Sequence, residues 1–233
     1  MLRCLFRGKM NMKTLKAYKF LSTKYALEAL KYRKLKVATL DSLNDSHEMQ
    51  AVNLKEKRFR KDFKSKLKEL AEIRGFISFS QIWNNPIMWA HYADNQKGMC
   101  ICFEIPEKQI FEMLYVKKRI NRHEIHGEIN QPNATTNSTK KIFAKSKHWQ
   151  YEKELRQWYD LEETQYDKNK ELYFVPFGKN LKPVEVFIGP NCNLTDEQLK
   201  EMNNHSTEVT ITKTRAAFKN FSIVKDKRGL RVT

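Results

Sequence analysis

Residues 75–105, GFISFSQIWNNPIMWAHYADNQKGMCICFEI, decide the fold of this chain. Apolar and small polar residues alternate over Gly75–Ser80, which is the pattern of a half-buried strand. An Asn-Asn-Pro sequence then supplies a cap and a first-turn proline for a short helix over Ile87–Asp94. A glycine precedes the apolar run Met99–Ile105, which predicts a buried strand. These residues therefore predict a strand, a helix and a second strand in succession.

The residues before this stretch predict two helices and two short strands. A strand over Tyr18–Ser22 leads into a helix over Thr23–Leu35 with an apolar stripe among lysines, and Val37–Leu40 is a second short strand. Over residues 59–73, apolar side chains recur at three- and four-residue steps with Lys and Arg between them, as in an amphipathic helix. Gly75 follows and marks the expected end of that helix.

The residues after this stretch are richer in strands than in helices. Trp149–Tyr159 predicts a strand, and a capped helix is expected from Thr195 to Asn204. Further strands are predicted at Leu172–Phe177, Val184–Gly189, Thr207–Thr214 and Ala217–Lys225. Strands do not alternate regularly with helices, so the sequence predicts an α+β fold with a mixed, largely antiparallel sheet and flanking helices.

The length and composition fit one compact unit. The chain has 233 residues, enough for one large domain with a sizeable core. Asn121–Lys141 has no apolar period and is rich in Asn, Ser and Thr, so it predicts a flexible surface loop. We expect a single domain over residues 1–233 with a flexible loop near 121–141.

The charge of the chain favours an anionic partner. Lys and Arg number 44 against 27 Asp and Glu, which gives a formal net charge of +17. Such a chain carries a long-range positive field, and nucleic acid or another polyanion is the expected partner. The basic run Lys55–Lys68 is equally well explained as the solvated face of a helix.

The cysteines and the N-terminal residues favour a cytoplasmic protein. Four cysteines are too sparse for a disulfide scaffold and have no paired spacing for zinc, so reduced thiols are expected. Residues 1–15 have no continuous apolar stretch, so we expect neither export nor membrane insertion. His123, Glu124 and His126 cluster beside the expected loop, where ligand geometry is hard to hold, so no metal site is predicted.

Two segments combine polar groups with aromatic residues, and each supplies candidate site residues. On a strand, Glu152, Glu154 and Arg156 would share one face. Paired carboxylates raise one another's pKa and can hold hydroxyls or take protons, whereas Arg156 can equally neutralise them as an ion pair. In the earlier segment Ser78 and Ser80 would also share a face.

The short helix after these serines carries His91 and Tyr92. A single helical histidine is more often structural than catalytic, and His91 has no defined Ser or Cys partner in the sequence. The sequence contains no G-x-S-x-G nucleophile motif, P-loop or G-x-G-x-x-G phosphate cradle. The available chemistry is therefore that of carboxylates, hydroxyls, aromatic rings and positive charge.

An ordered set of sequence blocks resembles a bacterial family of unknown function, DUF2971. The resemblance spans most of the chain and departs mainly at Ser46-His47, where Pro-Phe is usual. The blocks are Tyr18-Lys19-Phe20, Leu43-Asn44-Asp45 with Glu48, Ser78-Phe79-Ser80, Met88–Asp94 with Gly98, and Trp149–Arg156. The family name implies no activity.

The order of these elements is similar, more distantly, to the ADP-ribosyltransferase superfamily, whose members cleave NAD at the nicotinamide ribose. The resemblance implies an ADP-ribosyltransferase-like fold with NAD as substrate. In that superfamily a basic residue on the first strand seats NAD, a Ser-x-Ser element supports the site, and the second Glu of Glu-x-Glu holds a ribose hydroxyl and steadies the transition state. The matching residues are Lys19, Ser78 with Ser80, Glu154, and Glu152 as the acceptor-activating group.

The resemblance implies an NAD-dependent enzyme that modifies a nucleic acid or a nucleic-acid-associated target, in a toxin or phage-defence context. Tyr92 or Trp149 can stack on nicotinamide or on a target base. Two alternatives remain open. One is a non-catalytic nucleic-acid-binding protein in which Lys55–Lys68 contacts phosphates. The other is a metal-independent nuclease or phosphodiesterase that uses His91 and Glu152.

Overall fold

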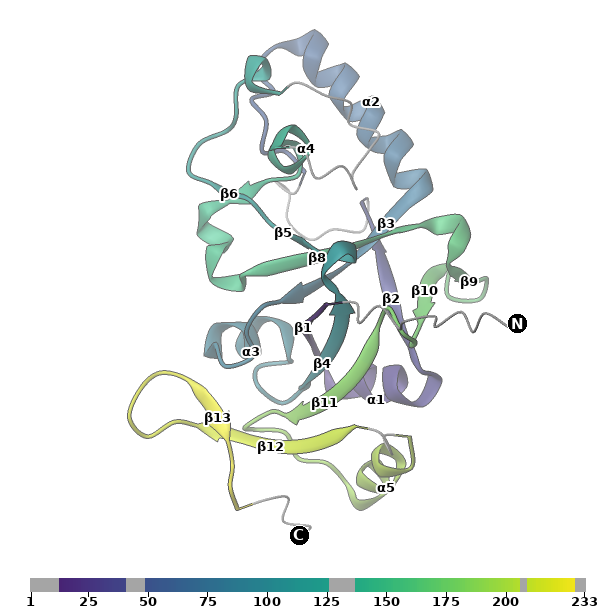
Figure 1. Cartoon of the computed structure of the whole chain (residues 1–233), viewed down its shortest axis with the longest axis vertical. Coiled ribbons are helices and arrows are strands. Elements are labelled where there is room, and N and C mark those ends of the chain that lie inside the picture. Colours follow the sequence, from purple (N-terminus) through teal and green to yellow (C-terminus); the bar gives the residue numbers. More distant parts are fainter. Residues whose placement is uncertain (1–12, 41–48, 126–136, 206–208, 229–233) are drawn as a thin grey trace, which may run out of the picture.

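The computed structural model describes residues 13–40, 49–125, 137–205 and 209–228, and within these ranges its largest unit is an 11-stranded sheet (Figure 1). The strands of this sheet are β1 (Thr14–Leu21), β2 (Lys34–Thr39), β3 (Arg74–Ser80), β4 (Met99–Pro106), β5 (Phe111–Glu112), β8 (Glu154–Asp160), β9 (Gln165–Asp167), β10 (Leu172–Pro176), β11 (Lys182–Ile188), β12 (Thr210–Ala216) and β13 (Ile223–Lys225). The described helices are α1 (Thr23–Tyr32), α2 (Lys57–Ile73), α3 (Pro86–Tyr92), α4 (Asn137–Ile142) and α5 (Asp196–His205). A separate two-stranded sheet consists of β6 (Tyr115–Val116) and β7 (Lys145–Ser146).

Most neighbouring strands run antiparallel. Among the described strands, the parallel pairs are β11 with β12 and β6 with β7. The predicted α+β fold with a mixed, largely antiparallel sheet and flanking helices is therefore confirmed. Its likeness to ADP-ribosyltransferases stays a prediction.

The sheet branches at β3. One edge of β3 pairs with β8 over its whole length, from Arg74 opposite Asp160 to Ser80 opposite Glu154. The other edge pairs with β2 through Gly75 and Phe76 and with β1 through Ser80. Strands β1 and β2 thus pair with the same edge of β3, one at each end of that strand. The residues of β3 between these two pairings lie at the junction.

The central strand β4 is buried on both faces, which explains its continuous apolar sequence. Ile101 and Phe103 pack in the core cluster that includes Leu30 of α1 and residues of α5. Cys100 and Cys102 point to the other face and pack with Trp89 of α3. Both thiols are free and buried, in agreement with the reduced cysteines that the sequence predicts.

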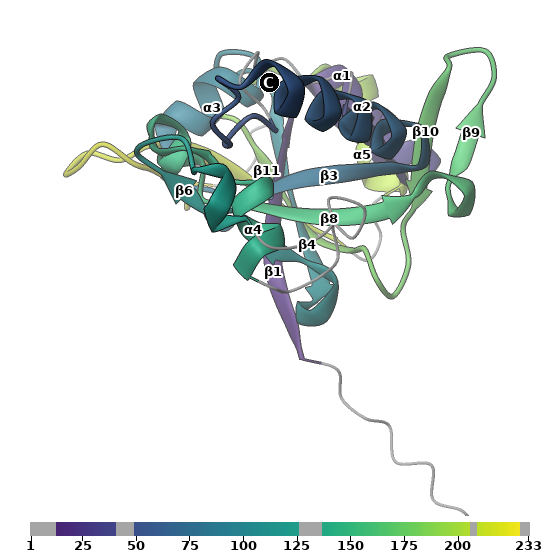
Figure 2. The same cartoon turned by 90° about the horizontal axis from the view of Figure 1, so that it is seen from above.

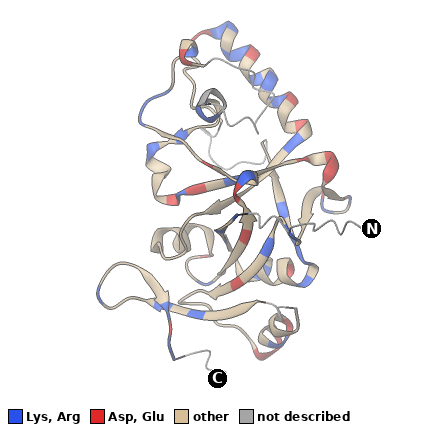
Figure 3. Cartoon of the chain, viewed as in Figure 1, with Lys and Arg blue, Asp and Glu red and all other residues tan. Residues whose placement is uncertain are grey.

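Helix α2 packs one face and exposes a cationic one. Phe63 and Leu70 are buried against Phe76 of β3 and Phe143. The exposed basic residues on the helix are Lys57, Arg58, Lys61, Lys64, Lys66 and Lys68, and Figure 3 shows the basic positions along it. The predicted helix and its apolar stripe are therefore confirmed from Phe59 to Leu70, whereas Ile73 at the helix end is 57 % exposed.

The helix ends just before Gly75, as the sequence predicts, but Gly75 is not a left-handed cap. The helix ends at Ile73, Arg74 has an extended backbone, and Gly75 already belongs to β3. A Cβ atom at Gly75 would lie 2.5 Å from Val37 Cγ1 and 2.8 Å from the carbonyl oxygen of Ala38. Glycine is needed there because β2 approaches β3 too closely for any side chain.

Two other predictions from the sequence require correction. Residues 147–152 form a 3₁₀ helix, and Lys153 has a left-handed backbone with φ of 44°, so the strand predicted over Trp149–Tyr159 begins only at Glu154. Of the loop predicted over residues 121–141, Arg122–Glu124 form a capped 3₁₀ turn and residues from Asn137 onward belong to α4. Residues 126–136 lie outside the described part, as do Ser46 and His47.

None of the helices in the described ranges is both long and apolar enough to cross a bilayer. The same residues contain no group of three or more His, Cys, Asp and Glu that can hold a metal ion. His126 lies outside these ranges, so the prediction that it forms no metal site with His123 and Glu124 stays a prediction.

Candidate functional site

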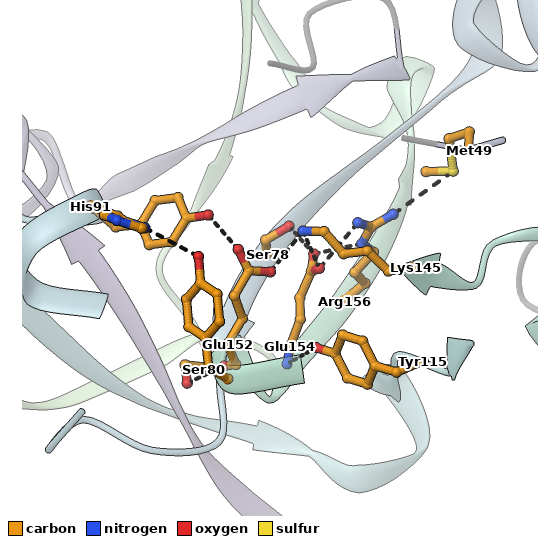
Figure 4. Close-up of polar contacts among 11 residues, drawn as sticks. Met49, Ser78, Ser80, His91, Tyr115, Lys145, Glu152, Glu154 and Arg156 are labelled. Carbon is orange, nitrogen blue, oxygen red and sulfur yellow. Dashed lines mark hydrogen bonds and ion pairs between the residues drawn. The ribbon is translucent and has the colours of Figure 1, made fainter. Parts of the chain in front are cut away.

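The centre of the site is the carboxylate of Glu154, the first residue of β8. Ser78 Oγ, from the adjacent strand β3, donates to Glu154 Oε1 at 2.7 Å (Figure 4). Arg156 donates from Nε to Oε1 at 2.6 Å and from a terminal nitrogen to Oε2 at 3.2 Å. Lys145 Nζ, from β7, lies 3.1 Å from Oε2. One buried carboxylate therefore receives a hydroxyl and two cations.

These contacts keep Glu154 ionised. Burial by itself raises the pKa of this carboxyl group, but the charges of Arg156 and Lys145 and the hydrogen bonds from Arg156 and Ser78 outweigh it and lower the pKa to about 2. Its side chain is 5 % exposed. Glu154 is thus a fixed negative charge in a site from which most solvent is excluded.

Glu152 is linked to Glu154 through Lys145. Lys145 Nζ lies 2.7 Å from Glu152 Oε2 and bridges the two carboxylates, and its own side chain is 10 % exposed. The hydroxyl of Tyr92 donates to the other oxygen of Glu152. Although Glu152 lies in the 3₁₀ helix and not on the strand, the left-handed Lys153 between the two residues turns both carboxylates toward one cation.

The backbone around the carboxylates is held by hydroxyl groups. Ser80 Oγ donates to the carbonyl of Glu152 at 2.6 Å. The backbone N–H of Glu154 donates to the Tyr115 hydroxyl at 2.8 Å. Ser78 and Ser80 are therefore close to one another, as the sequence predicts, but Ser80 fixes the backbone while Ser78 contacts a carboxylate.

The exposed rim of the site consists of aromatic residues around α3. Tyr92 is 39 % exposed, and its hydroxyl reaches inward to Glu152. His91 is exposed and its Nδ1 lies 3.1 Å from the Tyr151 hydroxyl. Trp149 is partly buried, with Lys145 Nζ 5.1 Å from its ring centroid. Tyr92 thus contacts the first carboxylate of the pair, and Trp149 lies beside the cation that bridges both.

Lys19 contacts the site through the backbone of β3. Its Nζ donates to the carbonyl oxygen of Ser78 at 3.0 Å, at the junction where β3 passes from β2 to β1. Burial lowers the pKa of Lys19 to about 8, although the charge of Glu154 opposes that shift. Lys19 is therefore linked to Glu154 through Ser78, whose carbonyl accepts from Lys19 and whose hydroxyl donates to the carboxylate.

Replacing Lys19 with methionine should remove a contribution to stability that increases between about pH 8 and pH 10.5. The unfolded chain binds more protons than the folded one between the folded pKa of about 8 and the ordinary value of 10.5. The Lys19 contribution to the free energy of unfolding therefore rises with pH in this window. Urea unfolding of the wild type and K19M at several pH values would measure the difference between their free energies of unfolding. The titrations of tyrosines and cysteines are common to both proteins and cancel in this difference. If the free energies of unfolding of the two proteins change in parallel with pH, the lowered pKa of Lys19 is contradicted.

Three residues of the site were missed at the sequence level. Lys145 contacts both carboxylates, Tyr115 contacts the backbone N–H of Glu154, and Tyr151 contacts His91 on the rim. Lys145 is one of 44 basic residues and lies at the start of a two-residue strand, so no periodicity or spacing distinguishes it. Tyr115 pairs with Lys145 in the small sheet, a contact that short segments do not predict.

A groove of about 900 Å³ lies on another side of this cluster, between α2, β2 and β10. Met49, Lys68, Tyr166 and Tyr173 are among the residues that line it. Met49 connects it to the site, because Arg156 donates to Met49 Sδ at 3.8 Å. Neither Glu152 nor Glu154 is among the residues that line this groove.

Comparison with known proteins supports one part of the resemblance. A family model described as a protein of unknown function (DUF2971) matches residues 88–157, which include α3, Lys145 and both carboxylates. No curated protein and no solved structure matches the chain. The chain is therefore similar to DUF2971 proteins over the segment that supplies most of the site.

Proposed function

We propose that this protein is an NAD-dependent ADP-ribosyltransferase-like enzyme that cleaves the nicotinamide–ribose bond and modifies a nucleic acid or a nucleic-acid-associated target. One observation carries the proposal: Lys19, Ser78 and Glu154 lie on three neighbouring strands and are joined by hydrogen bonds of 3.0 and 2.7 Å. Lys19 and Ser78 are 59 positions apart in the sequence, and Ser78 and Glu154 are 76 positions apart. The resemblance assigns all three residues to one site.

The electrostatics of Glu154 suit the cleavage step. When the bond between the ribose C1′ and the pyridinium nitrogen breaks, its electron pair leaves with neutral nicotinamide and positive charge develops on the sugar. A preplaced carboxylate stabilises that charge, as in glycoside cleavage. The pKa of about 2 keeps Glu154 negative throughout the neutral range. Glu154 is the residue that we assign to this role.

Glu152 is suited to the transfer step. A lone pair of the acceptor forms the new bond to C1′, and the acceptor proton must pass to a base. The Glu152 carboxylate lies between Tyr92 on the exposed rim and Lys145 in the interior, so an acceptor that displaces the Tyr92 hydroxyl reaches it first. The rings of Tyr92 and Trp149 provide surfaces for nicotinamide or a target base.

The proposal is tested by incubating the protein with NAD and separate RNA, DNA and protein acceptors. We expect nicotinamide release, measured by chromatography, and an acceptor whose intact mass increases by one ADP-ribosyl group. Absence of both products with every acceptor, together with no thermal shift on addition of NAD, would count against the proposal.

Replacing Glu152 with glutamine should separate cleavage from transfer. Loss of the acceptor base is expected to reduce adduct formation by about 10²-fold or more, while nicotinamide release falls much less. The measurement is the ratio of adduct to released nicotinamide in one reaction. A Glu112→Gln variant, which changes an exposed carboxylate on β5, is the matched control and should keep the ratio of the wild type. An unchanged ratio in E152Q would remove Glu152 from the transfer step.

A further inference from the structure

The connection between β12 and β13 exposes two phenylalanines almost completely. Phe218 is 88 % exposed and Phe221 is 99 % exposed. Figures 1 and 2 both show this connection projecting from the body of the molecule. Large apolar rings on a projecting turn gain nothing from the core of their own chain, and such exposed groups are typical of contact sites. We call residues 210–225 the arm and residues 217–222 its tip.

The residues around the two rings are basic in sequence, and two of their cations lie close to the tip. Residues 209–228 contain six basic residues and the single acid Asp226, which pairs with Arg228. The Arg215 guanidinium lies over the Phe218 ring, 4.3 Å from its centroid, and Lys219 lies exposed between the two phenylalanines. The tip therefore combines flat apolar rings with cations and has no carboxylate of its own.

The base of the arm is fixed while the tip is exposed. The N–H of Ala217 donates to the carbonyl of Ser222 at 2.9 Å and closes the tip. Ile223 is 2 % exposed, and its N–H donates to the carbonyl of Asn84 at 2.9 Å. Asn84 immediately precedes the residues that begin α3, the helix that carries His91 and Tyr92. The backbone that carries the rings is thus anchored beside the helix that forms the rim of the site.

We propose that the tip of the arm is a stacking platform for the bases of single-stranded nucleic acid. Phe218 and Phe221 supply the rings, and Arg215 and Lys219 supply cations for the phosphates. Charge complementarity supports this partner, because the whole chain carries a net charge of +17 and α2 exposes further lysines. A duplex keeps its bases stacked inside and is not expected to use the rings. This site does not depend on NAD cleavage.

The test measures binding of fluorescently labelled single-stranded RNA, single-stranded DNA and a duplex of equal length, by anisotropy and without NAD. Replacing both phenylalanines by alanine (F218A/F221A) should weaken single-strand binding at least about tenfold, since stacking on one aromatic ring contributes on that order or more. Both rings are solvent-exposed, so folding should not change. Comparison of the affinities for single-stranded RNA and single-stranded DNA identifies which of the two sugars is preferred.

Three further variants distinguish base stacking from a general apolar contact. F218W/F221W should bind like the wild type because the rings are kept, whereas F218L/F221L should lose affinity as the alanine variant does. Tyr25→Ala removes a 58 % exposed ring on α1 and should have no effect. Full binding by F218L/F221L would indicate an apolar partner surface and would overturn the proposal. Undiminished binding by F218A/F221A, or no single-strand binding by the wild type, would do the same.

Discussion

Replacing Glu154 with glutamine should lower the rate of nicotinamide release from NAD by at least about 100-fold, because a neutral amide cannot oppose the positive charge that develops on the ribose. Glutamine has nearly the same shape, and Ser78 can still donate to its carbonyl oxygen. Initial rates at saturating NAD would isolate the effect on kcat from any change in binding.

Folding must be controlled in this variant, because it leaves Arg156 and Lys145 without one carboxylate partner. Ser78→Ala keeps the Glu154 charge and both cations, and it removes only the hydroxyl that fixes the carboxylate. We expect its rate to lie between those of the wild type and E154Q. If E154Q melts like the wild type and turns over NAD at the same rate, Glu154 has no part in cleavage.

Replacing Arg156 with methionine should destabilise the fold by about 3 kcal/mol, because removal of one partner leaves an ionised carboxylate in a buried site. Arg156 is 1 % exposed, donates twice to Glu154, and stacks its guanidinium 4.3 Å from the Phe76 ring centroid. For a chain of this size, that loss corresponds to a fall in Tm of roughly 6–12 °C. Calorimetry against Arg58→Met, which alters an exposed arginine on α2, measures the effect.

Acid titration provides a second readout of the same ion pair. The folded pKa of Glu154, about 2, lies below its ordinary value of 4.5, so its contribution to stability is full above pH 4.5 and is lost as pH falls toward 2. Without the Arg156 charge this pKa rises, and R156M should lose less stability over that interval than the wild type. Equal melting of R156M and wild type at neutral pH would show that Arg156 contributes only packing.

The fold was largely predictable because its elements carry strong local patterns. Met99–Ile105 became a strand buried on both faces, and residues 59–73 became a helix with one buried face. Gly75 follows the end of the helix as predicted, but a glycine there commonly caps the helix, whereas here it allows close approach of β2. That approach is a tertiary contact, which local sequence does not encode.

The sequence singled out Ser78, Glu152 and Glu154, which the fold brings into one cluster, but it did not indicate their geometry or the contact with Lys145. A shared strand face was expected for Glu152 and Glu154, yet the left-handed backbone of Lys153 places only Glu154 on the strand. Arg156 forms an ion pair with Glu154, one of the possibilities that the sequence left open. Lys145 completes the arrangement from a small sheet whose pairing depends on long-range contacts.

The pairing of β3 with β8 also constrains how the protein is made. Ser78 and Glu154 are 76 residues apart, so closing that loop is a late and entropically costly event in folding. During synthesis, β8 must have left the ribosome before Glu154 can pair with Arg156 and Lys145. A product of premature termination upstream of β8 would therefore lack Glu154 and Arg156, the ion pair at the centre of the charged cluster, and the complete cluster cannot form until translation of that strand is finished.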